Sequence, residues 1–527
     1  MNLNKKVLKV AIFSVLVITV MTSCAVAKKS TSVSTEKRTE MTVGPTPGYN
    51  TKIPSKIMTP DKVETRIGTL EFFDGIPTKE TSDLLYDNLD FLRGIETFLN
   101  GIPLASLESI RLAHRSLGAT EANQVLIFDK LMDSTPLFLT GNTSTVYALG
   151  MLDLKKDGPT VIEVPAGAGP GTVNNALFRF VIDLGAPGPD RGKGGKYLIL
   201  PPGYEGEVPE GYFTVKSPSY INWIALRGFL EDNKPDAATK MWKEGLKIYP
   251  LSKVSHQPTM EFISGSGKEF NTIHANNYEF YEELHTVIER EPVEMLDPEL
   301  RGLFASIGIE KGKPFNPDKR MKEILTDAAE VANGTARSIF WSTKYEGGFL
   351  FEDRYWKKGF LSESHEFLKD EGMGGRDLDD RSHFYYMATV NTPMMAIKLV
   401  DKGSTYAWGY LDSKGNHLDG SKNYKINLPK DAPARDFMSI AVYDSQTRSL
   451  LQTDEPFPSK NNKRDKMITN EDGSTDIYFG PKPPVGKESN WIQTVPGKGW
   501  FTVLRLYSPK QEWWDKKWIP SDIELIK

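Results

Sequence analysis

The chain has 527 residues, of which 39% are hydrophobic and 25% are charged, and this composition is typical of folded domains. Its 65 Lys and Arg residues and 69 Asp and Glu residues give a net charge of −4, which argues against a nucleic-acid-binding surface. A single Cys excludes a disulfide framework and a Cys-rich metal centre, and with 7 His residues we expect neither a metal nor a cofactor.

The first 23 residues have the pattern of a secretory signal peptide. Three lysines precede an apolar stretch, residues 10–21, that is shorter than the roughly 20 residues a membrane-spanning helix needs. The stretch ends in Met21-Thr22-Ser23-Cys24, which resembles the lipobox of bacterial lipoproteins, where the cysteine receives lipid. Ala25 follows, and not Asp, as in lipoproteins sorted to the outer membrane.

We therefore expect a bacterial envelope protein that is exported and held in the membrane, the outer more than the inner, by lipid on Cys24. An ordinary signal peptide with an incidental cysteine is the alternative. Residues 24–62 are rich in Ser, Thr, Lys, Pro and Gly, which predicts a flexible tether between the lipid and the folded body.

Apolar residues recur at helical spacing from Leu84 to about Leu117, and Gly101 and Pro103 interrupt them, which predicts two paired helices. Beyond Asn123 the pattern changes to short strand-like runs bounded by Gly and Pro, typical of an antiparallel sandwich. Examples of such runs are residues 160–164, 176–184, 196–200, 212–216 and 221–230. Helices are expected next, at residues 237–247, 278–291, 298–306, 317–339 and 356–368.

Three short motifs in the first half of the chain are Asn142-Thr143-Ser144-Thr145-Val146-Tyr147, Leu152-Asp153-Leu154 and Gly158-Pro159. At these motifs the chain resembles a bacterial family known as domain of unknown function 1254 (DUF1254). It resembles the companion DUF1214 at Ala441-Val442-Tyr443-Asp444, Asn490-Trp491 and Arg505-Leu506-Tyr507. The resemblance implies two β-sandwich modules, the second of jelly-roll type, joined by helices, and it supplies no activity. Thr143-Ser144 replaces a more usual Arg-Asp, so acid chemistry in that motif would be missing at Ser144.

Pattern and resemblance together predict an α+β, β-rich fold with two antiparallel β-sandwich modules and a helical insert between them. We expect a helical entry with the first sandwich over residues 63–235, the insert over 236–383 and the second sandwich over 384–527. Five of the ten tryptophans lie in the last 37 residues, and we expect the segment after Lys510 to close the second sandwich.

Common catalytic motifs are missing from the sequence. It contains no phosphate-binding loop, no Gly-x-Ser-x-Gly elbow and no His-Glu-x-x-His, and lipid on Cys24 would leave no free thiol. Two arginines on predicted strand faces stand out instead. Arg179 shares a face with Leu177 and Val181, and Arg505 shares one with Val503. A structural ion pair or a cation–π contact is one explanation, and an anchor for a carboxylate or phosphate is the other.

The polar stretch at Asn142 is either an exposed turn or the edge of a pocket. We single out six residues as ligand-binding candidates, with no assigned catalytic residue: Asn142, Thr145, Tyr147, Arg179, Asp444 and Arg505.

Our leading hypothesis is a lipid-anchored envelope protein that binds a small polar or saccharide-like ligand, such as a glycan. An envelope hydrolase without a Ser–His or Cys nucleophile is the second hypothesis, and a structural or assembly protein is the third. The partners expected are the membrane, through Cys24, and the ligand, with no nucleic acid and with oligomer formation left open.

Overall fold

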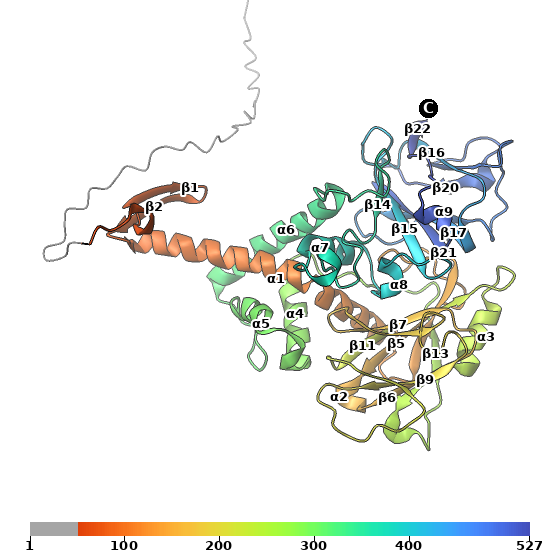
Figure 1. Ribbon diagram of the computed structural model, residues 1–527, viewed down its shortest axis with the longest axis horizontal. Coiled ribbons are helices and arrows are strands. Elements are labelled where there is room, and N and C mark those ends of the chain that lie inside the picture. Colours follow the sequence, from red (N-terminus) through yellow and green to blue (C-terminus); the bar gives the residue numbers. More distant parts are fainter. Residues whose placement is uncertain (1–50, 527) are drawn as a thin grey trace, which may run out of the picture. The chain divides into compact units, whose positions relative to one another are not determined.

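The computed structural model describes residues 51–526 and divides into two compact units, one that ends at Asp83 and one that begins at Leu84 (Figure 1). The predicted signal peptide, the predicted lipidation site at Cys24 and most of the predicted tether lie outside the described residues. The first unit contains a three-stranded sheet of order β1-β2-β3. Its elements are η1 (Ser55–Ile57), β1 (Lys62–Thr65), β2 (Gly68–Phe73) and β3 (Ile76–Pro77). No helix in the described part of the chain combines the length and hydropathy that a membrane span needs.

Helix α1 (Lys79–Ser116) is continuous, so the prediction of two paired helices is wrong. Gly101 is a packing position, because a Cβ there would lie only 3.0 Å from Leu284 and 3.2 Å from Phe280 of a neighbouring helix. Pro103 removes one main-chain hydrogen bond, and the flanking Ile102 and Leu104 are fully buried. Tertiary packing therefore holds the helix together across both residues.

The first sandwich has a six-stranded sheet of order β13-β4-β5-β11-β7-β8 and a four-stranded sheet of order β10-β9-β6-β12. Neighbouring strands are antiparallel except in the pairs β4–β13 and β9–β10. Val146 and Ile224 of the larger sheet pack with Ile162 and Ile199 of the smaller one. The strands are β4 (Gln124–Ile127), β5 (Thr145–Asp153), β6 (Thr160–Val164), β7 (Pro170–Asn175), β8 (Phe180–Gly185), β9 (Gly195–Leu200), β10 (Phe213–Lys216), β11 (Ile221–Phe229), β12 (Lys247–Pro250) and β13 (Glu261–Ser264).

One predicted strand of this sandwich begins later than expected. The run 176–184 becomes a strand only at Phe180, because the main-chain N–H of Asn175 donates to the carbonyl oxygen of Arg179 (3.0 Å) and closes a tight turn. Phe178 adopts a φ of 55° in this turn. Arg179 therefore lies exposed between β7 and β8, and its predicted place on an apolar strand face is wrong.

The second sandwich has a five-stranded sheet of order β14-β15-β21-β17-β18 and a four-stranded sheet of order β20-β19-β16-β22, with only β19–β20 parallel among its pairs in the described residues. Ala407, Ile440 and Leu504 of the larger sheet pack with Ile426 and Ile477 of the smaller one. The strands are β14 (Trp356–Lys358), β15 (Ser404–Gly409), β16 (Asn423–Leu428), β17 (Ala434–Asp444), β18 (Ser459–Asn461), β19 (Thr475–Gly480), β20 (Trp491–Gln493), β21 (Trp500–Pro509) and β22 (Glu524–Ile526). The expected β-rich α+β fold is confirmed.

Four of the five helices expected in the middle of the chain are present, and the helix expected at residues 356–368 is not. Trp356 instead begins strand β14 opposite Gly409, where a Cβ would lie 2.9 Å from the Trp356 ring, so the missing side chain makes room for it. The helices beyond α1 are α2 (Leu154–Asp157), α3 (Asp236–Gly245), α4 (Glu279–Arg290), α5 (Pro298–Ala305), α6 (Lys319–Trp341), α7 (Leu378–Met387), α8 (Pro393–Ala396) and α9 (Gln511–Trp514), with 3-10 turns η2 (Leu251–Lys253), η3 (Val293–Met295), η4 (Asp370–Gly372) and η5 (Glu488–Asn490).

A central core lies between the two sandwiches. The six-stranded and five-stranded sheets each turn a second face toward this core, where Trp223 of β11 and Phe501 of β21 are buried. Helices α1, α4, α6 and α7 fill the rest of it (Figure 1). Both large sheets are therefore covered on both faces, and polar side chains on their inner faces are removed from bulk water.

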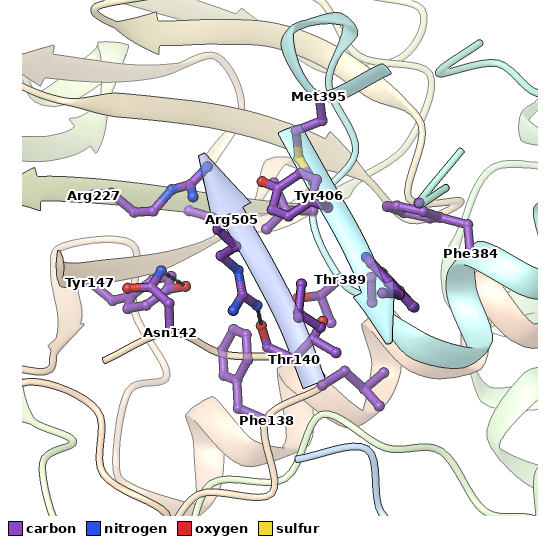
Figure 2. Close-up of a pocket in the computed structure, with 17 residues that line it drawn as sticks. Phe138, Thr140, Asn142, Tyr147, Arg227, Phe384, Thr389, Met395, Tyr406 and Arg505 are labelled. Atoms are coloured by element: carbon purple, nitrogen blue, oxygen red, sulfur yellow. Dashed lines mark hydrogen bonds between the residues drawn. The ribbon is translucent and has the colours of Figure 1, made fainter. Parts of the chain in front are cut away.

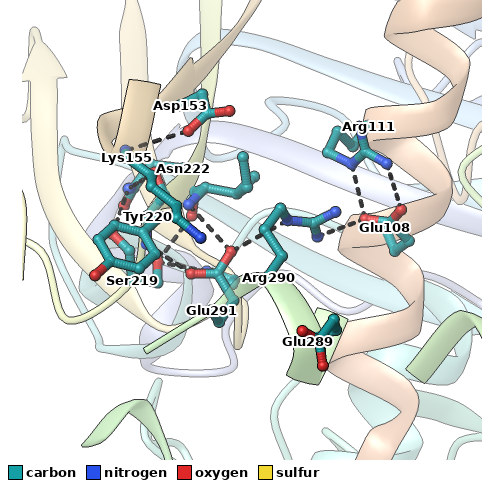
Figure 3. A network of polar contacts seen from close by, with 12 residues as sticks. Glu108, Arg111, Asp153, Lys155, Ser219, Tyr220, Asn222, Glu289, Arg290 and Glu291 are labelled. Atoms are coloured by element: carbon teal, nitrogen blue, oxygen red, sulfur yellow. Dashed lines mark hydrogen bonds and ion pairs between the residues drawn. The ribbon is translucent and has the colours of Figure 1, made fainter. Parts of the chain in front are cut away.

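A buried ion-pair network joins the helices to the first sandwich (Figure 3). Glu108 of α1 is 2% exposed and accepts hydrogen bonds from Arg111 Nε (2.9 Å) and Nη2 (2.6 Å) and from Arg290 Nη2 (2.6 Å). The adjacent Glu291 accepts from the main-chain N–H of Tyr220 (2.6 Å), beside the start of β11. The network thus fixes α1 and α4 against the strand that carries the site described next.

Candidate functional site

The candidate site is a cavity of about 50 Å³ between the inner faces of the six-stranded and five-stranded sheets (Figure 2). Since one water takes about 10–15 Å³ on this measure, the cavity has room for a few waters or a small charged group. Aromatic and apolar side chains form much of its wall, including Phe138, Phe384 and Trp408. Its lining contains two arginines and no Asp or Glu.

Each sheet contributes one arginine that lies directly opposite a tyrosine on the neighbouring strand. Arg227 of β11 is the partner of Tyr147 of β5, and Arg505 of β21 is the partner of Tyr406 of β15. All four residues line the cavity, and the guanidinium groups of the two arginines point toward its interior (Figure 2). The same arrangement of side chains is thus presented from both sides.

Arg505 is held firmly in the wall of the cavity and is only 4% exposed. Its Nη1 donates to the hydroxyl of Tyr443 (2.5 Å) and its Nη2 donates to the carbonyl oxygen of Thr140 (2.6 Å). The guanidinium carbon lies 5.4 Å from the ring centroid of Tyr443 and 5.9 Å from that of Tyr406, at cation–π distance. These contacts orient the group without neutralising its charge.

Neither Arg227 nor Arg505 forms an ion pair with a carboxylate of the described residues, and the surrounding tyrosines supply no negative charge. Burial raises the pKa of Tyr443 to about 12, although Arg505 opposes the shift, and burial likewise raises the pKa of Tyr147. Both hydroxyls are therefore neutral at physiological pH. Because an unpaired charge in an apolar site costs several kcal/mol, an anion in this cavity would be strongly favoured.

The polar stretch that follows Thr140 is buried, so the exposed-turn interpretation of it is wrong. Asn142 Nδ2 donates to the hydroxyl of Tyr147 (2.6 Å), while Asn142 Oδ1 accepts from the main-chain N–H of Ser144 (2.9 Å) and from Thr145 Oγ1 (3.0 Å). Since the Tyr147 oxygen is the acceptor in this contact, its own hydrogen remains able to donate to a ligand. Asn142 thus orients Tyr147, and Thr145 in turn orients Asn142.

A larger cavity of about 640 Å³ adjoins the first. The two cavities share four lining residues, which are Ala225, Arg227, Val390 and Met395. Arg227 is half-buried and faces both cavities. Val390 has a φ of 67°, which is strained for a β-branched residue and is typical of segments that shape a binding site.

Two polar groups face the larger cavity. The hydroxyl of Tyr507 is buried without a hydrogen-bond partner in the described residues. Asp183 accepts from Thr392 Oγ1 (2.8 Å), and burial raises its pKa to about 6. The larger cavity can therefore form hydrogen bonds with polar groups of a ligand.

Three of the six candidate residues, Asn142, Tyr147 and Arg505, line the small cavity together. Thr145 lies beside Asn142 without lining the cavity, and Arg179 lies in a different cavity. Asp444 pairs with Lys498 (2.5 Å) and is also outside the small cavity.

Sequence reasoning missed Arg227 and Tyr406. The signal for Arg227 was available, because it alternates with Trp223 and Ala225 on one face of an apolar run, as Arg505 does in its strand. The described residues contain no cluster of three or more His, Cys, Asp or Glu side chains suited to a metal ion.

Residues 122–250 match the family model described as Protein of unknown function (DUF1254), and residues 403–511 match the one described as Protein of unknown function (DUF1214). The chain therefore contains a DUF1254 region and a DUF1214 region. Asn142, Tyr147 and Arg227 lie in the DUF1254 region, whereas Tyr406 and Arg505 lie in the DUF1214 region. The small cavity is therefore built jointly by the two regions.

Among solved structures, the chain is similar to the VPA0106 protein from Vibrio parahaemolyticus, with 17% identity, 83% of this chain and 100% of that chain covered, and a TM-score of 0.50. It is also similar to an uncharacterised protein from Burkholderia cenocepacia, with 11% identity, coverage of 84% and 96%, and a TM-score of 0.38. The first similarity shows a shared fold. A search of curated proteins found no match.

Proposed function

We propose that this protein binds a small organic anion whose carboxylate lies between Arg227 and Arg505. The observation that carries this proposal is the pair of arginines, one from each large sheet, in a cavity lined by no Asp or Glu. Guanidinium groups bind carboxylates through paired, charge-assisted hydrogen bonds, which are stronger than neutral ones.

The sizes of the two cavities support an anion with an attached body. The small cavity has room for a charged head group, and the adjoining 640 Å³ cavity has room for the rest of the molecule. The hydroxyls of Tyr147 and Tyr507 can meet polar groups on such a ligand. A sugar acid, which combines a carboxylate with several hydroxyls, has this chemistry and agrees with the polar, saccharide-like ligand expected from the sequence.

The proposed place of this binding is the bacterial envelope, with the protein anchored by lipid on Cys24. The lipobox-like Met21-Thr22-Ser23-Cys24 supports this proposal. Replacing the thiol in Cys24→Ser should release the protein from the membrane fraction without changing its melting temperature. A variant that stays in the membrane fraction after a high-salt wash would contradict lipid anchoring.

Thermal melting of the purified protein with matched acid and neutral ligands tests the binding function. Glucuronate, succinate and benzoate are compared with glucose and with benzyl alcohol at equal ionic strength. A carboxylate that binds folded protein raises the melting temperature with its concentration. We expect at least one acid to do so and its neutral counterpart to have no effect, and isothermal titration then gives its dissociation constant.

The variant Arg227→Met should lose the shift caused by the acid. Arg337→Met is a matched control, since Arg337 is also a half-buried arginine beside a tyrosine ring, at 5.7 Å from the Tyr386 centroid, and lies outside both cavities. The control should keep the full shift. If Arg227→Met bound the acid as well as the wild type, the proposed site would be wrong.

Hydrolysis is the second candidate function, and Asp183 is the observation in its favour. Its carboxyl group lines the larger cavity, the Thr392 hydroxyl donates to it, and its pKa of about 6 suits a general acid. If esters or glycosides of the bound acid were cleaved by the wild type and bound but not cleaved by Asp183→Asn, the protein would be an enzyme. If the wild type and Asp183→Asn both bound these compounds and neither cleaved them, the protein would be a binding protein and the hydrolase hypothesis would be wrong.

A further inference from the structure

A third cavity, of about 280 Å³, lies where the turn between β7 and β8 approaches α1 and the segment before α7. Three arginines line it: Arg179 from the turn, Arg376 from the segment and Arg381 from the first half of α7. None of them lines the cavity between the sheets. The function proposed above makes no use of this cluster.

The charges around this cavity are strongly unbalanced. Lys216 adds a fourth positive side chain, and Glu366 is the one carboxylate in the lining. None of the three arginines forms an ion pair with a carboxylate anywhere in the described part of the chain. Glu366 offers Arg376 its main-chain carbonyl oxygen and not its carboxylate. The cluster therefore has no counter-charge within ion-pair distance.

The arginines also repel one another. Burial first, and then the charges of Arg376 and Arg179, lower the pKa of Arg381 to about 10. Burial and the charge of Arg179 lower the pKa of Arg376 as well. Since like charges held together destabilise a fold unless something compensates them, their grouping in one cavity calls for a ligand of opposite charge.

Two polar atoms at the cavity lack partners. Arg381 Nη2 donates to Asn100 Oδ1 (2.5 Å), but Arg381 Nε is buried without an acceptor in the described residues. Asn391 is 1% exposed, and its Nδ2 donates to the carbonyl oxygen of His365 (2.7 Å) and to the hydroxyl of Tyr385 (3.0 Å). Its Oδ1 is buried with no donor. The cavity therefore offers both an unused donor and an unused acceptor.

We infer that the cluster of Arg179, Arg376 and Arg381 binds a phosphate group, either as the inorganic ion or as a phosphate monoester. A tetrahedral oxyanion with two negative charges accepts hydrogen bonds from several guanidinium groups at once, and arginine is suited to phosphate by its planar, forked donors. The protonated oxygen of hydrogen phosphate can donate to Asn391 Oδ1. The 280 Å³ volume leaves room beyond the phosphate for the group a monoester carries.

Melting of the purified full-length protein in sodium phosphate and in sodium chloride of equal ionic strength tests this site. Phosphate should raise the melting temperature of the wild type by several degrees beyond the effect of chloride. Glycerol phosphate serves as the monoester, and the tighter of the two in isothermal titration identifies the source of the phosphate group. The absence of any phosphate-specific shift with both probes would overturn the inference.

The variants Arg376→Gln and Arg179→Gln should each lose most of the phosphate-specific shift. Without phosphate, Arg376→Gln should melt at or above the wild-type temperature, because removing one of three like charges relieves repulsion. A purely structural arginine would behave in the opposite way, with a lower melting temperature in both buffers. Arg179 is itself exposed, so Arg179→Gln keeps the test informative if the other variant fails to fold.

The two proposed sites are separable, because Arg227 lines the small cavity and the adjoining larger one but not the cavity of the arginine cluster. The phosphate-specific shift should persist in Arg227→Met and disappear in Arg376→Gln, whereas the carboxylate shift should show the reverse. A phosphate shift lost in Arg227→Met and retained in Arg376→Gln would assign phosphate to the cavity between the sheets and would overturn the inference.

Discussion

Arg227 and Arg505 occupy corresponding places in two different sheets, since each lies directly opposite a tyrosine of the neighbouring strand and both line one cavity. One belongs to the DUF1254 region and the other to the DUF1214 region. A ligand held between them would bridge the two regions, and its binding would therefore stabilise their association. The consequences can be tested at particular residues.

The two arginines should respond differently to removal in the absence of ligand. Arg505→Met should lower the free energy of unfolding by about 1–3 kcal/mol, because the Thr140 carbonyl oxygen and the Tyr443 hydroxyl lose a buried donor. Arg227→Met should leave it unchanged or raised, because a charge without a carboxylate partner is removed. Urea unfolding measures both. An equal loss in the two variants would show that Arg227 has a structural partner and that the charge argument is wrong.

Tyr147→Phe should cost stability as well as ligand binding. The Tyr147 oxygen accepts from Asn142 Nδ2, and its loss leaves a buried amide donor unpaired, at a cost of about 1–3 kcal/mol. Tyr507→Phe is the matched control, because the Tyr507 hydroxyl is buried without a partner in the described residues and its removal should be neutral or stabilising. Chemical denaturation of the two variants checks this difference, and an equal effect would count against it.

Glu108→Gln should destabilise the protein by about 3–5 kcal/mol, since it leaves Arg111 and Arg290 without their shared carboxylate. Burial raises the pKa of Glu108, but the hydrogen bonds and charges of the two arginines outweigh this and hold it below the ordinary value. The stability that Glu108 contributes is therefore present above the unfolded carboxyl pKa and is lost as pH falls through the folded pKa. Unfolding followed from pH 7 to pH 3 should show a shallower acid loss in Glu108→Gln than in the wild type.

The buried amine of Lys357 should make the free energy of unfolding rise as the pH rises from 7 to 9. Its amine is buried, donates to the carbonyl oxygen of Phe340 (2.7 Å), and has a pKa that burial lowers from 10.5 to about 7. The unfolded chain therefore binds more protons than the folded chain in this pH range, so stability rises with pH. Lys357→Met should reduce the slope of the free energy of unfolding against pH. The same slope in variant and wild type would show that Lys357 is charged in the folded protein.

Truncation after Lys510 should destabilise the second sandwich by several kcal/mol. Trp513 and Trp518 are buried in its core, and β22 pairs with β16 at the sheet edge. Burial of each large apolar side chain contributes about 1.5–3 kcal/mol. Poor expression or an early melting transition of the truncated protein is the expected result, and a normally folded truncation that had lost only ligand binding would contradict it.

The amino-acid sequence by itself determined several strands of the first sandwich and the choice of Arg505. Alternation with a period of two places apolar residues on one face of β6, β9 and β11, and it places Arg505 among apolar neighbours in β21. These are local properties, because a strand's two faces follow from backbone geometry alone. The same alternation in β11 would also have pointed to Arg227.

Only the tertiary structure decided which of these side chains meet. The period of a strand does not say which sheet its face will contact, so nothing local separates Arg505, which meets Arg227 in one cavity, from Arg179, which a tight turn sends to another. Packing likewise decided that α1 continues through Gly101, because helix α4 lies against the space a side chain would fill. In all of these examples the conformation is stabilised by contacts between residues that are distant in the chain. Such contacts exist only once the sheets and helices have come together.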